Sequence, residues 1–167
     1  KKLGIGMGTP YFKNKALIRR FNVAVFSSNY PLYGDISQRV MDVLMQMEPE
    51  VEVYSIDEAF VTFPTGKYFD LENYAGFLRD TMQRDTGIPV SIGFGPTKTL
   101  AKIANRFAKK NNVTASTFIL KNQHNMKVLL AKVNVDDIWG IGRRYADRLK
   151  KHGIHTALEL MQCNDTW

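Results

Sequence analysis

The chain has 167 residues, of which 44% are hydrophobic and 23% are charged. These proportions are typical of a folded protein and exclude a collagen-like, low-complexity or disordered chain. No apolar run reaches the length of a membrane span, and the N-terminal residues do not have the pattern of a signal peptide. Cys163 is the one cysteine, so neither an internal disulfide nor a thiolate zinc site is expected. We therefore expect a cytoplasmic protein without a membrane association.

Charge is distributed unevenly along the chain, which has a formal net charge of +7. Residues 95–112 carry five basic side chains and no acid, and residues 139–155 carry five basic side chains with Asp147 as their one acid. Residues 40–72 instead carry eight carboxylates with Lys67 as their one basic residue. This separation predicts an acidic partner, which the basic segments would contact, and a distinct acidic centre.

In the first half of the chain the hydrophobic pattern changes from helical to alternating. Apolar residues at helical spacing predict a helix over residues 35–48, closed by Pro49. Alternation then predicts two short strands over residues 51–55 and 59–63. Ile56-Asp57-Glu58 joins them, so this segment is expected to form a hairpin.

The middle of the chain alternates between predicted helices and strands. An amphipathic helix is expected over residues 70–86, ending at Gly87, followed by a strand over residues 89–95. A second helix is expected over residues 97–110, and a further strand over residues 116–120. This order predicts a domain of the α+β or α/β class.

The C-terminal part, from Lys132 onward, is expected to be a small all-helical unit. A Gly-x-Gly turn precedes a helix that ends at Gly153, and another short helix follows. The turn consists of Gly140, Ile141 and Gly142, and this spacing resembles the helix-hairpin-helix pattern. A plain turn between two helices is the alternative interpretation.

Arg143 and Arg144 directly follow this turn. Amides at the start of a helix favour an anion, and the two arginines add positive charge there. The pattern predicts contacts with nucleic-acid phosphates that do not read the base sequence.

Asp57 and Glu58 are neighbouring acids between apolar strands. At a hairpin turn two successive side chains can converge, and two carboxylates held together favour an oxygen-liganded cation such as Mg²⁺ or Mn²⁺ between them. An acidic turn exposed to solvent is the alternative, and the pair alone does not decide between the two interpretations.

Basic residues repeat at helical spacing along the predicted helix 97–110, opposite its apolar face. They are Lys98, Lys102, Arg106, Lys109 and Lys110. We call this row the basic stripe. The absence of acids from the helix favours phosphate binding, although a solvated helix face remains the alternative.

Four segments together resemble the Y-family of translesion DNA polymerases, and its UmuC-like branch in particular. They are Ser27-Ser28-Asn29-Tyr30, Tyr54-Ser55-Ile56-Asp57-Glu58-Ala59-Phe60, residues 93–105 and residues 136–144. They occur in the family's order over nearly the whole chain.

The resemblance implies an α+β polymerase palm, with packed helices and a mixed sheet rich in antiparallel strands. It assigns residues 1–34 to part of the fingers, residues 35–130 to the palm and residues 131–167 to an incomplete helix-hairpin-helix thumb. The family's first strand, with a third metal-binding Asp and an aromatic steric gate, is not found here, nor is its little finger. We therefore expect this chain to be a fragment that does not polymerise DNA unaided.

The resemblance also implies a function, DNA-directed DNA polymerisation in lesion bypass by a two-metal mechanism with two Mg²⁺ ions. Asp57 would bridge the ions and Glu58 would bind the one that activates the primer hydroxyl. Lys109 matches the family's triphosphate-binding lysine, and Lys1 falls at the position of a second nucleotide contact in the fingers. Lys102 and the Gly-x-Gly turn would bind DNA.

The implied partners are primer–template DNA and a deoxynucleoside triphosphate. Relatives in this branch also work with a UmuD-like subunit, a recombinase filament and a sliding clamp, in the bacterial cytoplasm at the nucleoid. A noncatalytic DNA-binding module, with a purely structural acidic hairpin, is the alternative function.

Overall fold

The computed structural model describes residues 2–6, 8–62, 70–110 and 116–164, and it divides into two compact units, Lys1–Gly34 and Asp35–Trp167. Each unit is described by itself. In chain order the elements are α1 (Tyr11–Arg20), α2 (Tyr30–Met47), β1 (Val51–Ser55), β2 (Glu58–Val61), α3 (Leu71–Thr86), β3 (Ile92–Phe94), α4 (Lys98–Lys110), β4 (Thr117–Ile119), α5 (Gln123–Leu130), η2 (Val135–Asp137), α6 (Arg143–Lys151) and α7 (Ala157–Gln162). None of the described helices is both long and apolar enough to cross a bilayer.

Two helices at the start of the chain differ from the sequence expectation. Helix α1 was not predicted, and none of its residues is buried. Helix α2 begins at Tyr30, five residues before the predicted start. The Asn29 side chain accepts a hydrogen bond from the Leu32 backbone N–H at 3.2 Å, which satisfies one free amide of the first turn. Pro31 fits that turn because its nitrogen needs no hydrogen-bond partner there.

Strands β1 and β2 form the predicted antiparallel hairpin. Its turn is shorter than expected, because Glu58 is already the first residue of β2 and pairs with Ser55. The register is irregular between Val53 and Ser55. As a result Asp57 lies in the turn itself, whereas Glu58 has the fixed position of a strand residue.

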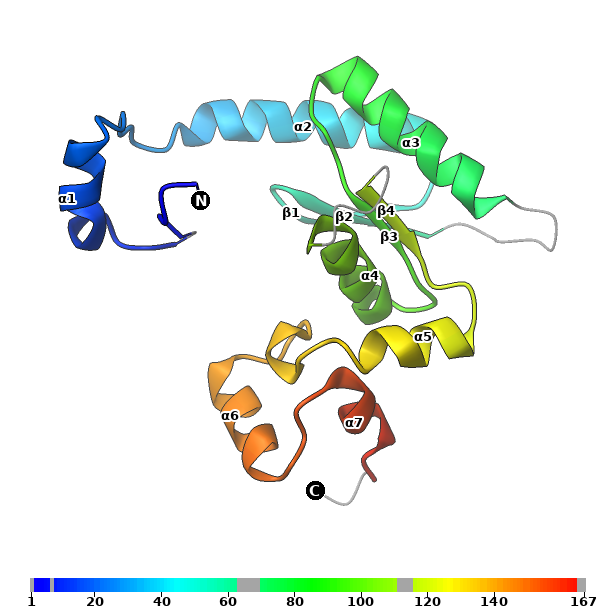
Figure 1. The fold of residues 1–167 in the computed structure, drawn as a ribbon. Helices are drawn as coiled ribbons and strands as arrows, with labels where there is room; N and C mark the ends of the chain where they lie inside the picture. The colour runs from blue at the N-terminus through cyan, green and yellow to red at the C-terminus, as the bar shows by residue number, and fades with distance from the viewer. Residues whose placement is uncertain (1, 7, 63–69, 111–115, 165–167) are drawn as a thin grey trace. The chain divides into compact units, whose positions relative to one another are not determined.

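Strands β3 and β4 pair in parallel, and α4 connects them. Helices α3 and α4 both pack against this pair, above and below it in Figure 1. Gly93 allows the close approach of α4, because a Cβ there would lie 2.2 Å from the Asn105 backbone nitrogen. Helices combined with two small sheets, one antiparallel and one parallel, confirm the predicted α+β class.

The C-terminal helices share a hydrophobic core with α4. Ile103 of α4, Leu129 and Leu130 of α5, and Ala157 of α7 form one buried cluster. Helix α5 was not predicted, and the Asn122 side chain caps it by accepting from the Asn125 N–H at 2.9 Å. Because this core continues from α4 into α7, the helical unit packs directly on the sheet-containing part. The predicted palm–thumb boundary after residue 130 stays a prediction.

Candidate functional site

The two predicted acidic ligands lie on the β1–β2 hairpin in different environments. Asp57 is exposed in the turn, and its carboxylate accepts a hydrogen bond from the Ser55 hydroxyl at 2.9 Å. The Glu58 side chain is 35% exposed and accepts from the Lys102 ammonium of α4 at 2.8 Å. The Asp57 carboxylate therefore has no ion-pair partner in the described part of the chain, whereas the Glu58 carboxylate is paired with Lys102.

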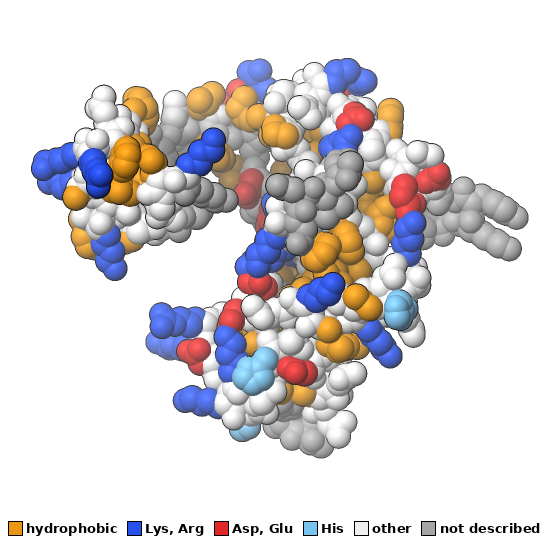
Figure 2. Space-filling view, in the orientation of Figure 1, with side chains coloured by type: hydrophobic (Ala, Val, Ile, Leu, Met, Phe, Trp, Pro, Cys, Tyr) orange, Lys and Arg blue, Asp and Glu red, His pale blue; other side chains and the backbone are white. Residues whose placement is uncertain are grey.

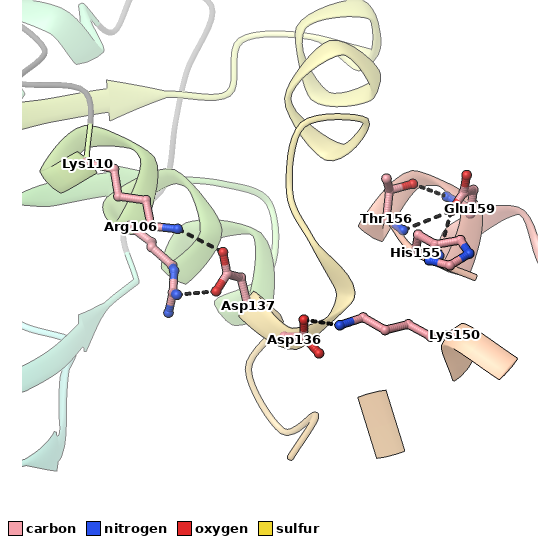
Figure 3. Close-up of polar contacts among 8 residues, drawn as sticks. All are labelled: Arg106, Lys110, Asp136, Asp137, Lys150, His155, Thr156 and Glu159. Carbon is pink, nitrogen blue, oxygen red and sulfur yellow. Dashed lines mark hydrogen bonds and ion pairs between the residues drawn. The ribbon is translucent and has the colours of Figure 1, made fainter. Parts of the chain in front are cut away.

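The basic stripe of α4 lies against acids from two other segments. Four ion pairs connect it to them, Lys98–Glu52, Lys102–Glu58, Arg106–Asp137 and Lys110–Asp137. The first two acids belong to the hairpin and the third to η2, as Figure 3 shows for Asp137. Most of the positive charge that sequence reasoning assigned to phosphate binding is thus matched within the protein. The absence of acids from α4 was the signal that its partners lie elsewhere in the chain.

Lys109 differs from the other members of the basic stripe. It is exposed, and no ion pair links it to any other residue in the described part of the chain. It follows Lys102 by seven residues, so it lies on nearly the same face of α4, about 10 Å further along the axis. Its ammonium group is therefore open to an anionic ligand, and the triphosphate contact of Lys109 stays a prediction.

Carboxylate oxygens from Asp57 and Glu58 are hard donors of the kind that Mg²⁺ prefers. The donor chemistry of the hairpin therefore fits a divalent cation. Within residues 2–6, 8–62, 70–110 and 116–164, however, no three His, Cys, Asp or Glu side chains converge on one point. The hairpin offers two candidate carboxylates, fewer than the three ligands that the family resemblance implies.

An aromatic cluster joins the hairpin to the segment before the Gly-x-Gly turn. The ring of Trp139 lies 5.2 Å from that of Tyr54 and 5.6 Å from that of Phe60, and its Nε1–H donates to the Tyr54 hydroxyl at 3.1 Å. The Lys102 ammonium lies 4.8 Å from the Tyr54 ring and 5.1 Å from the Trp139 ring. Sequence reasoning missed this contact, because nothing local in the sequence indicates it.

The predicted DNA-binding turn leads directly into α6. Gly140 has a φ of 88°, which favours glycine, and the Ile141 N–H donates to the Ile138 carbonyl at 3.0 Å. Gly142 caps α6 without a side-chain hydrogen bond, so the amides of the first turn remain available to an anion. Arg143 and Arg144 are exposed there, and neither has an ion-pair partner in the described part of the chain. Figure 2 shows Lys and Arg side chains gathered over this helix.

The face of α6 that packs inward is narrow. Ala146 is completely buried, whereas its neighbour Tyr145 is 66% exposed. Gly153 has a φ of 78° and ends the helix as expected, with the Ile154 N–H donating back to the Leu149 carbonyl at 3.0 Å. The other predicted nucleotide contact, Lys1, lies outside the described residues.

Comparisons with known proteins show which family the chain is similar to. A model of the impB/mucB/samB family matches residues 1–106, and a model of that family's helix-hairpin-helix motif matches residues 125–154. The chain is 46% identical to protein UmuC of Salmonella typhimurium over all of its own length and 40% of that protein's. It is 30% identical to DNA polymerase IV of Corynebacterium diphtheriae over 99% of the chain and 36% of the polymerase.

Solved structures of DNA polymerases have the same fold. A ternary insertion complex of Dbh DNA polymerase superposes with a TM-score of 0.77 at 27% identity, over 98% of this chain and 46% of the polymerase. DinB from Sulfolobus solfataricus superposes with a TM-score of 0.73 at 27% identity, over 98% of this chain and 47% of that protein. The chain thus spans less than half the length of these two proteins, and about 40% of the length of curated relatives such as UmuC and SamB of Salmonella typhimurium.

Proposed function

Because the chain belongs to the impB/mucB/samB family, we propose that it carries part of the catalytic centre of a DNA polymerase that copies damaged templates. The observation that supports this most is the placement of the hairpin acids against α4. Glu58 contacts Lys102, and Lys109 lies on the same helix face with its ammonium free of described carboxylates. Carboxylates and an ammonium group without a described ion-pair partner therefore lie on two elements in direct contact, which supports a site for metal ions and a triphosphate. The substrates would be primer–template DNA and deoxynucleoside triphosphates.

Asp57 and Glu58 would hold the divalent cations in this proposal. When bound, Mg²⁺ would supply a lowered pKa for the primer hydroxyl and charge compensation for the departing pyrophosphate. Asp57 is suited to bridging because its turn position leaves the carboxylate open to solvent. Lys109 would orient the triphosphate. Two Mg²⁺ ions, and a third carboxylate beyond the described residues, remain part of the proposal.

The turn from Gly140 to Gly142 would bind the DNA backbone together with Arg143 and Arg144. Lys102 was predicted to bind DNA as well, but its 2.8 Å contact with Glu58 supports a role beside the carboxylate instead. A UmuD-like subunit, a recombinase filament and a sliding clamp remain predicted partners. The predicted cytoplasmic, nucleoid-associated location is likewise part of this proposal.

Primer extension by the complete polypeptide that contains this chain tests the catalytic proposal. Asp57→Asn and Glu58→Gln should each abolish Mg²⁺-dependent extension while duplex affinity stays within about two-fold, because neither carboxylate is assigned to the DNA backbone. Glu52→Gln is the matched control, since Glu52 is a neighbouring hairpin acid paired with Lys98. Extension that survives both substitutions at Asp57 and Glu58 would contradict the proposal.

A noncatalytic DNA-binding module that uses α6 and the basic stripe is the second candidate. It is favoured by the ion pairs that give the hairpin acids Glu52 and Glu58 structural partners on α4. Replacing Arg143 and Arg144 with Ala should reduce the slope of log affinity against log salt by about one unit for each phosphate that the protein no longer neutralises. Both candidates predict that change. Only the polymerase also predicts metal-dependent extension that Asp57→Asn removes.

A further inference from the structure

The Lys102 ammonium contacts one carboxylate and two aromatic rings. It contacts Glu58 at 2.8 Å and lies over the rings of Tyr54 and Trp139 at 4.8 and 5.1 Å. The side chain is 22% exposed, the least of the lysines in the described ion pairs. An ammonium held by a carboxylate and by ring faces on other sides is fixed in position, because each contact restricts a different direction of movement.

The Lys102 ammonium would repel a second cation that binds to Glu58. A divalent ion that binds this carboxylate would be repelled by an ammonium 2.8 Å from the carboxylate oxygen. This repulsion favours the release of one of the two positive groups from the carboxylate. Lys102 has a flexible four-carbon side chain, so it can withdraw without a change in the backbone.

We infer that Lys102 is the resident counter-ion of Glu58, and that it leaves the carboxylate when a divalent cation binds there. This inference rests on the proposed function, in which Glu58 is a metal ligand. Lys102 is then a positioning residue, because it holds the Glu58 side chain in place when no metal is bound. It would also set a threshold for metal binding, since the cation competes with an existing ion pair.

The release of Lys102 would also be felt at Trp139, which directly precedes Gly140. The indole loses its cationic neighbour while its Nε1–H still donates to the Tyr54 hydroxyl at 3.1 Å. Metal binding at the hairpin is thereby coupled to the segment that begins the DNA-binding turn. The coupling is direct, because Lys102 contacts both Glu58 and Trp139.

Lys98 offers a matched control on the same helix. It lies one turn before Lys102, forms an ion pair with a hairpin acid, Glu52, and lies 5.3 Å from the ring of Phe60. Glu52 is not an assigned metal ligand, and neither Lys98 nor Glu52 contacts Trp139 in the described interactions. Replacing Lys98 therefore removes one positive charge and one ion pair from the helix, as replacing Lys102 does. It leaves the Glu58–Lys102 pair intact.

Binding of MnCl₂, measured by electron paramagnetic resonance of the free ion, tests the competition. Lys102→Met should bind Mn²⁺ about five-fold more tightly than the unaltered protein, because a unit charge a few ångströms away in a solvent-screened site has an effect of this order. Lys98→Met should stay within about two-fold. Lys102→Arg, which keeps the charge, should also stay close to the unaltered protein and shows that the effect follows charge rather than a folding defect.

Tryptophan emission tests the coupling without reference to activity. In a Trp167→Phe background Trp139 is the one remaining tryptophan. In the protein that retains Lys102, titration with MgCl₂ should change the Trp139 emission. This change should be absent from Lys102→Met and retained in Lys98→Met. Equal Mn²⁺ affinity of the two methionine variants, or an identical Mg²⁺ response in both, would overturn this inference alone. Mn²⁺ binding unaltered by the double change Asp57→Asn and Glu58→Gln would overturn the proposed function together with it.

Discussion

The Lys110 ammonium of α4 donates to the Asp137 carboxylate of η2 at 2.9 Å, and Arg106 contacts the other oxygen of the same group. Asp137 therefore compensates two cations, although its own side chain is only 17% exposed. Its neighbour Asp136 pairs with Lys150 of α6 (Figure 3). Two consecutive acids thus link η2 to two different helices, and this fixes the start of the helical unit against α4.

The first prediction concerns the relative strength of these two links. Asp137→Asn should lower the free energy of unfolding by about 1 kcal/mol, because it weakens two charge-assisted contacts of a half-buried group. Asp136→Asn should lower it by less than about 0.5 kcal/mol, since its single pair is more exposed, with 37% of the Lys150 and 44% of the Asp136 side chain open to solvent. Urea unfolding in low salt measures both values. Equal effects of the two substitutions, or a loss for Asp137→Asn that does not shrink at about 1 M salt, would contradict this account.

The second prediction concerns the hydrogen bond between Trp139 and Tyr54. Tyr54→Phe removes the acceptor and leaves the indole N–H of a half-buried side chain without it, which should lower the free energy of unfolding by about 1 kcal/mol. Tyr145→Phe is the control, because that ring is 66% exposed and removal of its hydroxyl should leave the free energy of unfolding almost unchanged. Chemical denaturation of both variants provides the comparison. A Tyr54→Phe protein as stable as Tyr145→Phe would show that the hydroxyl contributes nothing to stability.

The elements that local sequence determines were predicted closely. Asp70 caps α3 and Gly87 ends it with a φ of 73°, so the boundaries of that helix depend on residues at its ends. Helix α4 was likewise found within one residue at its start, because its apolar and basic faces repeat at helical spacing. Helix α1 was not predicted, because it buries none of its residues and lacks a clear apolar stripe.

The candidate site was predicted only in part, and for a physical reason. The acids at Asp57 and Glu58 could be located from the hairpin pattern. The partner of Glu58, however, is 44 residues away in the chain, and the Tyr54–Trp139 contact spans 85 residues. Such pairs depend on how α4 and η2 pack against the hairpin, which composition and periodicity do not specify. The contact of Lys102 with Glu58 could therefore not be predicted, and the assignment of Lys102 to DNA stays a prediction.

The third prediction compares Gly142 and Gly93, which differ in the space available for an added Cβ. Gly142→Ala should fold normally, because no atom lies within 4 Å of the added Cβ, but it should weaken duplex DNA binding several-fold by keeping phosphate away from the backbone. Gly93→Ala should instead destabilise the fold by about 3 kcal/mol or more, because its Cβ would lie 2.2 Å from the Asn105 nitrogen. Thermal melts and fluorescence anisotropy with labelled duplex measure the two properties. Unchanged DNA affinity of a folded Gly142→Ala protein would remove this turn from the proposed interface.

The fourth prediction uses two carboxyls whose pKa values move in opposite directions. Backbone N–H groups of His155 and Thr156 donate to Glu159 at 2.7 and 2.8 Å and lower its pKa below the ordinary value of 4.5 (Figure 3). Burial instead raises the pKa of Glu48 above the same value. The ionised Glu159 therefore stabilises the fold above pH 4.5, and this contribution is lost as the pH falls through its folded pKa. Ionisation of the buried Glu48 instead destabilises the fold, and this destabilisation develops as the pH rises through its folded pKa.

Melting temperatures of Glu159→Gln and Glu48→Gln between about pH 3 and pH 7 test these signs. At pH 7 Glu159→Gln should melt below the unaltered protein, and the difference should shrink on acidification because both proteins then carry a neutral side chain. Glu48→Gln should melt above the unaltered protein at pH 7, since a neutral amide avoids the cost of burying a charge. That gain should also disappear at low pH. Differences that stay constant over the whole range would mean that neither carboxyl titrates differently in the folded and unfolded chain.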